Sequence, residues 1–134
     1  MGNSSSELDI RQARMIEQTK LHLENAEAFL EAGAFESTKM SLNEAASALR
    51  QLQHDCKIRR GQPRKDLEIQ IIYYGSWQSA ISGIAAKRTS KPPVTYASLL
   101  NNSLAMARKL PLHDHPDSSE FTALLDKIEK WQSE

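Results

Sequence analysis

The chain has 134 residues, 40% of them hydrophobic and 25% charged, and this ordinary composition predicts one globular domain and excludes wholesale disorder. A single cysteine, Cys56, excludes an internal disulfide framework and a zinc site built from cysteines. Basic and acidic residues are equal in number, 17 each, and the pI of about 6.9 is low for a dedicated nucleic-acid-binding domain. Without a run of ~20 apolar residues or a signal-peptide pattern, we expect a cytoplasmic protein.

A helical hairpin is predicted over residues 7–57. We expect a flexible N-terminus at residues 1–6, with Ser6 as the N-cap of a helix from Glu7 to Ala32. Gly33 suits the left-handed residue after a helix, and a second helix, from Phe35 to Lys57, follows. Because two helices joined by a short turn run antiparallel, they are expected to pack on each other.

Each helix of this hairpin carries one apolar seam, in which residues repeat at spacings of three and four. The seams are Ile16, Thr19, Leu23, Ala26 and Leu30, then Phe35, Thr38, Leu42, Ala45, Leu49, Leu52 and Cys56. The alanines allow a close approach of the two helices, and the place of Cys56 on the seam predicts a buried apolar residue. Such seams also pair between chains, so a homodimer or a protein partner is expected there.

Three further helices are predicted within residues 66–132. Pro63 breaks the chain after the hairpin. From Asp66, Leu67–Ile71 alternates like a strand, but a longer helical period favours a helix of about twenty residues. Because its apolar residues lie on more than one face, we expect it to be the central helix.

The last two helices are marked by their predicted ends. Pro92 and Pro93 open a fourth helix that ends near Leu110, and Asp117 begins a fifth, with Glu120 in a capping-box position. The sequence therefore predicts an all-α fold, a single domain of residues 1–134 with four or five helices in a bundle built on the N-terminal hairpin.

Charge is segregated along the chain. Residues 1–49 carry a net charge of −4, residues 50–109 a net charge of +8, and residues 110–134 a net charge of −4. We expect one of two outcomes: an exposed basic surface, or neutralisation of the middle segment by the acidic ends inside the fold.

The candidate site for an anionic partner is basic and flanks the central helix on both sides. Its residues are Arg59, Arg60, Arg64, Lys65, Lys87, Arg88 and Lys91. Phosphates of nucleic acid or of anionic lipid suit such charge. Tyr73, Tyr74 and Trp77 lie between the two clusters and would stack on bases if exposed, but their apolar spacing favours burial.

The first residues fit the pattern for N-myristoylation, Met-Gly-x-x-x-Ser, with Gly2 as the acceptor. A single acyl chain needs a second membrane signal, which the basic segment would supply. The combination is similar to that of retroviral matrix proteins, small helical domains with a myristoyl group and a basic face. In this chain the basic residues lie far from the N-terminus, and membrane binding is expected only if Gly2 is lipidated.

Arg108 and His113 form an Arg-x4-His pair. With the hairpin around residues 26–37, this pair resembles HEPN domains, small helical folds of which some members are ribonucleases that use such an Arg and His. The hairpin is equally similar to the helix pairs of TPR and MIT domains. Pro111 interrupts the motif where the family has continuous helix.

No cofactor or metal is predicted. His113, Asp114, His115 and Asp117 lie close in sequence but lack the spacing of a complete ligand set. The sequence favours a non-enzymatic helical binding or regulatory protein, such as a phage or bacterial accessory protein, whose basic middle segment contacts nucleic acid or an acidic protein surface. A myristoylated membrane adaptor and a HEPN-like ribonuclease are the alternatives.

Overall fold

The computed structural model describes residues 2–58 and 65–134, with side chains for residues 10–55 and 66–134. Its five helices are α1 (Gly2–Glu31), α2 (Phe35–Ile58), α3 (Lys65–Arg88), α4 (Pro93–Ala107) and α5 (Ser118–Ser133). The described part of the chain has no strand, so the predicted all-α class is confirmed. Along this part no helix combines the length and apolar character needed to cross a bilayer.

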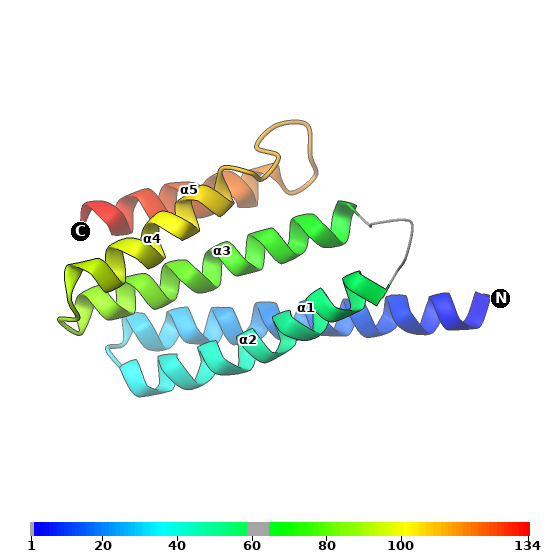
Figure 1. The fold of residues 1–134 in the computed structure, drawn as a ribbon, viewed down its shortest axis with the longest axis horizontal. Coiled ribbons are helices and arrows are strands. Elements are labelled where there is room, and N and C mark those ends of the chain that lie inside the picture. Colours follow the sequence, from blue (N-terminus) through cyan, green and yellow to red (C-terminus); the bar gives the residue numbers. More distant parts are fainter. Residues whose placement is uncertain (1, 59–64) are drawn as a thin grey trace.

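Successive helices run in opposite directions, so that the chain passes back and forth along the long axis of the molecule (Figure 1). α3 contacts all four other helices, with α1 and α2 on one side and α4 and α5 on the other. Its length of 24 residues corresponds to ~36 Å. The segment with the ambiguous strand-like start is thus a helix, because packing on both sides uses apolar residues around most of its circumference.

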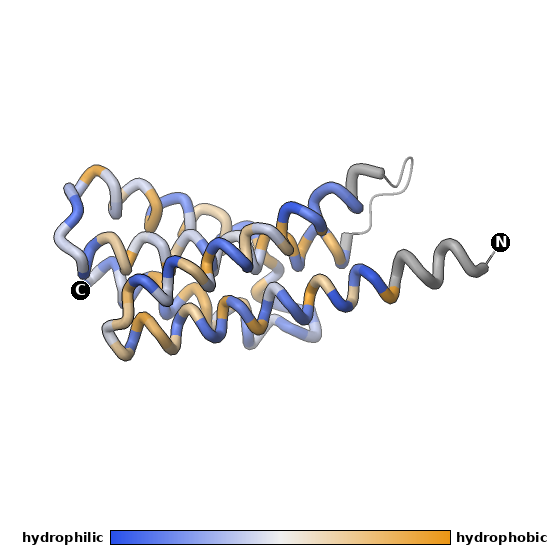
Figure 2. The backbone as a smooth tube through the Cα atoms, turned by 90° about the horizontal axis from the view of Figure 1, so that it is seen from below, coloured by the Kyte–Doolittle hydropathy of each residue, from blue (hydrophilic) through white to orange (hydrophobic). Residues whose placement is uncertain are grey.

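α1 and α2 form the predicted antiparallel pair. The buried apolar residues of the two seams include Leu23, Ala26, Leu30, Ala45, Leu49 and Leu52. Figure 2 shows hydrophilic and hydrophobic positions interspersed along the helices. Because the seams pack on each other within one chain, they contribute to its own core, and homodimerisation through them stays a prediction.

The turn between α1 and α2 is a Schellman motif. Gly33 has a φ of 76°, the amide of Gly33 donates to the carbonyl of Leu30 at 3.1 Å, and the amide of Ala34 donates to that of Phe29 at 2.9 Å. The same pattern ends α3, where Ser90 has a φ of 61° and the amide of Lys91 donates to the carbonyl of Ala86 at 3.0 Å. The left-handed conformation of Gly33 at the first turn was predicted. At the second turn a serine, Ser90, occupies the equivalent position.

One predicted helix start and one predicted capping box need correction. α1 begins at Gly2, so Ser6 lies within the helix instead of capping it, and the predicted start at Glu7 is wrong. Asp117 is the N-cap of α5, but its side chain forms no capping hydrogen bond, so the predicted capping box with Glu120 is not made. The amide of Asp117 instead donates to Nδ1 of His115 at 3.0 Å, and a φ of −103° with a ψ of 14° differs from the extended backbone of a side-chain cap.

α3 and α4 approach closely because small residues face each other. The hydroxyl of Ser76 donates to the carbonyl of Ser103 at 2.7 Å, and the hydroxyl of Ser103 donates to that of Ser76 at 2.8 Å, both buried. A methyl group on Gly83 would lie 2.8 Å from Cγ of Leu100. This reciprocal pair of hydrogen bonds satisfies both hydroxyls where no larger side chain fits.

Glu27 links three helices. Its carboxylate accepts from Nε1 of Trp77 in α3 at 2.9 Å and from Nζ of Lys127 in α5 at 2.9 and 3.0 Å. Nζ of Lys127 also lies 5.7 Å from the ring centroid of Trp77 and 5.9 Å from that of Trp131. The outer helices α1 and α5 are thereby connected through one partly buried charge pair.

Candidate functional site

The basic cluster at the C-terminal end of α3 is only partly free. Nε and Nη2 of Arg88 donate to the two carboxylate oxygens of Glu134 at 2.9 and 2.8 Å, and Nη1 reaches Glu31 at 3.4 Å. The hydrogen bond to Glu134 raises the pKa of Arg88 and lowers that of Glu134. Each acidic end of the chain thus contributes one carboxylate, and for Arg88 the expected internal neutralisation is confirmed.

Lys87 is also engaged within the protein. Its Nζ lies 3.4 Å from the backbone carbonyls of Trp131 and Gln132, at the end of α5, and 5.6 Å from the ring centroid of Tyr96. A cation at the C-terminus of a helix stabilises the unpaired carbonyls there. Lys87 therefore holds the end of α5 against α3.

Lys91 differs from these two residues. Its side chain is exposed, and it forms no ion pair with any residue of the described ranges. Of the remaining candidate residues, Arg59, Arg60 and Arg64 lie outside the described residues, as does the side chain of Lys65, the first residue of α3. Gly2 is the first residue of α1, and its lipidation stays a prediction.

The aromatic residues of α3 are not a base-stacking platform. Tyr74 is 5% exposed and Trp77 8% exposed, and Tyr73 packs against the core, with its ring 5.2 Å from that of Phe121. The predicted burial is confirmed for Tyr74 and Trp77, and Tyr73 is partly buried. Because Nε1 of Trp77 is used by Glu27, this ring is fixed inside the bundle.

Arg108 and His113 do not share a helix. α4 ends at Ala107, Arg108 is its C-cap residue, and His113 follows in the connection to α5. Both side chains are exposed. Pro111 lies between them, so the continuous helix on which the HEPN resemblance depends is interrupted.

The neighbouring histidine has a structural partner. Nδ1 of His115 accepts from the amide of Asp117, and its ring lies 5.2 Å from that of Phe121. Within the described ranges no group of three or more His, Cys, Asp or Glu side chains is arranged to hold a metal ion. The geometry around His115 explains the turn that begins α5.

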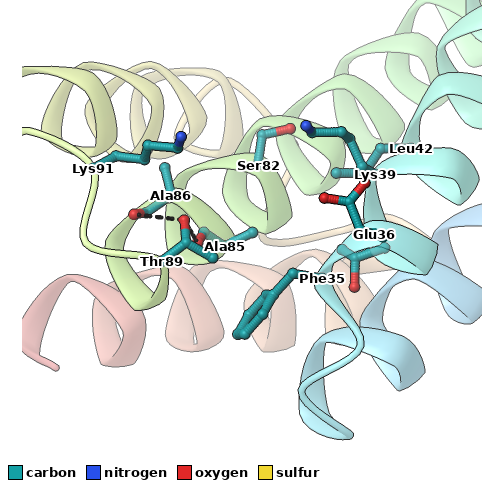
Figure 3. A pocket seen from close by; sticks show the side chains of 10 residues that line it. Phe35, Glu36, Lys39, Leu42, Ser82, Ala85, Ala86, Thr89 and Lys91 are labelled. Atoms are coloured by element: carbon teal, nitrogen blue, oxygen red, sulfur yellow. Dashed lines mark hydrogen bonds between the residues drawn. The ribbon is translucent and has the colours of Figure 1, made fainter.

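The exposed Lys91 lies at a hollow between the start of α2 and the end of α3. The hollow has a volume of about 350 Å³ and is partly open to solvent (Figure 3). Its lining is mainly apolar, from Phe35, Thr38 and Leu42 of α2, Ser82, Ala85 and Ala86 of α3 and Thr89 directly after α3, with Glu36, Lys39 and Lys91 as the charged members. The small side chains of α3 leave this space between two helices that otherwise pack together.

The polar groups of the hollow divide into satisfied and free ones. The Thr38 hydroxyl donates to the carbonyl of Ala34 at 3.0 Å, and that of Thr89 donates to the carbonyl of Ala85 at 2.8 Å. The Ser82 hydroxyl has no partner among the residues whose side chains are described, and Lys39 has no ion pair there either. Two ammonium groups and one hydroxyl remain as donors for a ligand.

Lys39 and Ser82 were missed by the sequence interpretation. Lys39 belongs to the acidic segment 1–49, and 52 positions separate it from Lys91. Nothing local marks either residue, because the hollow exists only where the first turns of α2 meet the last turns of α3. The antiparallel course of these two helices brings the lysines to the same end of the bundle.

Comparisons of this chain with models of protein families, with curated proteins and with solved structures give no match. The ligand or partner has therefore to be inferred from the residues themselves. Among the described side chains, the hollow with Lys39 and Lys91 combines a cavity with charges that the fold does not neutralise.

Proposed function

We propose that this chain is a helical binding protein whose basic middle segment contacts an anionic partner, either nucleic acid or an acidic protein surface. The observation that carries this proposal is the contrast between Lys91 and its neighbours. Arg88 and Lys87 are engaged by the end of α5, whereas Lys91 is exposed and has no ion pair in the described part of the chain. A charge that is not neutralised within the fold is available to attract a partner of opposite sign.

Lys39 supports the same proposal. It is exposed beside Lys91 at the hollow, although it comes from an acidic segment of the sequence. The basic residues 59–65 belong to the same middle segment as Lys91 and would add to its positive potential. Binding is favoured over catalysis because Arg108 and His113 lie beyond the end of α4 instead of within one helix.

The test is a binding titration with labelled single- and double-stranded oligonucleotides and with a polyglutamate peptide, at low and at physiological salt. We expect at least one of these anions to bind, with a log–log salt slope of about −2 or steeper for an oligonucleotide, because each neutralised phosphate contributes about −0.7 to −0.9. Binding should weaken in Lys91→Glu and in the double variant Arg59→Glu, Arg60→Glu.

The matched control for the double variant is Lys20→Glu with Lys130→Glu, which changes net charge equally at exposed lysines outside the middle segment, and Lys130→Glu alone is the control for Lys91→Glu. Circular dichroism checks that every variant is folded. If the controls weaken binding equally, the weakening in the middle-segment variants comes from net charge and not from their position. No binding of any of the three anions at low salt would contradict the proposal.

A further inference from the structure

We infer that the hollow between α2 and α3 binds a small amphipathic anion, an apolar chain or ring that carries one carboxylate. This ligand differs from the macromolecular partner proposed above, and its site is defined by the cavity as well as by charge. The apolar lining would receive the tail, and the lysines at the opening would receive the head.

The size and the lining of the hollow suit an apolar tail. Ligand pockets in proteins range over ~300–1,000 Å³ and are mainly apolar, with a few polar groups that orient the ligand. The hollow, at about 350 Å³, lies at the small end of this range, and Phe35, Leu42, Ala85 and Ala86 supply apolar surface. Because the hydroxyls of Thr38 and Thr89 donate to backbone carbonyls, a tail would leave neither of them unsatisfied.

Hydrogen-bond donors converge at the hollow and suit an anionic head. In Figure 3 the ammonium ends of Lys39 and Lys91 point toward one another from either side of Ser82 and Ala86. Two like charges directed at a common space repel each other unless an anion lies between them. The hydroxyl of Ser82, which has no partner among the described side chains, is a third donor on the same side of the hollow.

The charge count of the hollow favours an anion with a single negative charge. Lys39 and Lys91 outnumber Glu36, the only acidic residue in the lining, and the net charge is +1. A carboxylate would neutralise this excess. A cationic or neutral amphiphile would leave the two ammonium groups facing each other.

The test uses decanoate as the probe, below its micelle concentration, with binding followed by shifts of backbone amide resonances in nuclear magnetic resonance. Decan-1-ol has the same chain without the charge, and acetate has the charge without the chain. We expect decanoate to shift amides at the start of α2 and the end of α3, and to bind more tightly than either comparison compound. The double variant Lys39→Gln, Lys91→Gln should weaken decanoate by about fivefold or more, since two partly exposed charge contacts are lost.

The cavity is tested separately by Ala86→Leu, which fills the hollow and leaves both lysines in place. It should weaken decanoate binding strongly, and Ser82→Leu is a second filling variant in case the first is poorly folded. The matched controls are Ala105→Leu, at an exposed position of α4, and Lys20→Gln with Lys130→Gln.

Three results would overturn the inference: equal affinity for decanoate and decan-1-ol, equal affinity for decanoate and acetate, or wild-type binding in a folded filling variant. Oligonucleotide and polyglutamate binding measured on Ala86→Leu distinguishes this site from the proposed function. If that binding persists while decanoate binding is lost, the two are separate. If decanoate fails to bind the wild-type chain, the inference is wrong whether or not a macromolecular anion binds.

Discussion

At the residue scale, Glu27 has an unusual number of partners for a charged side chain on an outer helix. Its carboxylate accepts hydrogen bonds from Trp77 and from Lys127, with 24% of the Glu27 side chain and 36% of the Lys127 side chain exposed. Partial burial strengthens such a pair relative to one at a fully exposed surface. Glu27 is therefore a structural residue that connects helices far apart in the sequence.

We predict that Glu27→Ala and Glu27→Gln differ in stability. The alanine variant leaves both the indole N–H and the ammonium group without an acceptor and should lower the free energy of unfolding by ~2 kcal/mol. The glutamine variant keeps a carbonyl oxygen for Trp77 and should cost ~1 kcal/mol. Urea denaturation measures both, and Glu129→Gln, at an exposed position of α5, should stay within ~0.5 kcal/mol of the wild type. If both Glu27 variants lower the free energy of unfolding by the same amount, the prediction is wrong.

The buried tyrosines predict a loss of stability at alkaline pH. Burial, with added repulsion from Glu120 and other acids, raises the pKa of Tyr73 from 10.0 to about 12, and burial also raises the pKa of Tyr74. The unfolded chain releases these protons near pH 10 while the folded chain keeps them. The free energy of unfolding should therefore fall as the pH rises from 10 to about 12.

Phenolate absorbance measures this directly. In the folded chain two phenols should titrate late, and in urea they should titrate at the ordinary pKa. Tyr74→Phe should leave one late phenol. Titration of Tyr73 and Tyr74 near pH 10 in a chain that is still folded by circular dichroism would show that they are accessible to solvent.

At the scale of elements, the contact between α3 and α4 depends on two glycines with different surroundings. A Cβ atom on Gly83 would lie 2.8 Å from Cγ of Leu100 and 3.2 Å from its backbone nitrogen. A Cβ atom on Gly75 would lie 2.8 Å from Cε of Met106, the end of a flexible side chain. Space at Gly83 is thus limited partly by backbone, and space at Gly75 by a group that can move.

We predict opposite outcomes for alanine at these two positions. Gly75→Ala should be neutral or stabilise by up to ~1 kcal/mol, because alanine favours the helix and the Met106 side chain can move aside. Gly83→Ala should lower the free energy of unfolding by ~1–2 kcal/mol, because α4 must shift away from α3. Thermal or urea unfolding of the two variants provides the comparison, and a stabilised Gly83→Ala would mean that α4 adapts without cost.

At the scale of the whole molecule, the segregated charges of the sequence meet at one end of the bundle. Arg88 belongs to the basic middle segment, and its partners Glu31 and Glu134 belong to the two acidic ends. These groups are substantially exposed, with 59% of the Glu31 side chain and 43% of the Glu134 side chain accessible. Exposure limits their contribution to global stability, so their main effect is to hold the end of α5 in place.

We predict that Arg88→Gln lowers the free energy of unfolding by less than ~1 kcal/mol but speeds amide hydrogen exchange in the last turn of α5. Arg88 also lowers the pKa of Glu134, so the stabilisation is present above the ordinary value of 4.5 and is lost as the pH falls through the lowered pKa. The difference between variant and wild type should therefore diminish at acidic pH.

Arg108→Gln is the matched control, since this exposed arginine follows α4 at the other end of the bundle and has no ion pair within the described ranges. Its exchange at the end of α5 should equal that of the wild type. Faster exchange throughout the chain in Arg88→Gln, instead of only in α5, would show that the contact supports the whole fold.

Local patterns in the sequence determined most of the helices. The seams through Leu23 and Leu49 predicted the hairpin, Gly33 its turn, and Pro93 the start of α4, because helical periodicity and special backbone positions are properties of neighbouring residues. The burial of Tyr74 and Trp77 followed from the same periodicity. The predictions of the start of α1 and of the capping box of α5 were wrong, because whether Ser6 or Asp117 caps a helix through its side chain depends on the surrounding backbone as well as on the residue type.

Only the tertiary structure decided which charges are used inside the protein and which stay free. Arg88 and Lys91 are three positions apart and equally basic in sequence, yet Glu134, directly after α5, pairs with Arg88, whereas Lys91 stays exposed. The hollow that brings Lys39 to Lys91 also has no local signal, because it depends on how α2 packs against α3. Electrostatic pairing and cavities arise between residues distant in the chain, whereas a helix is specified by residues three and four apart, and this is why the sequence determined the elements and the packing decided the site.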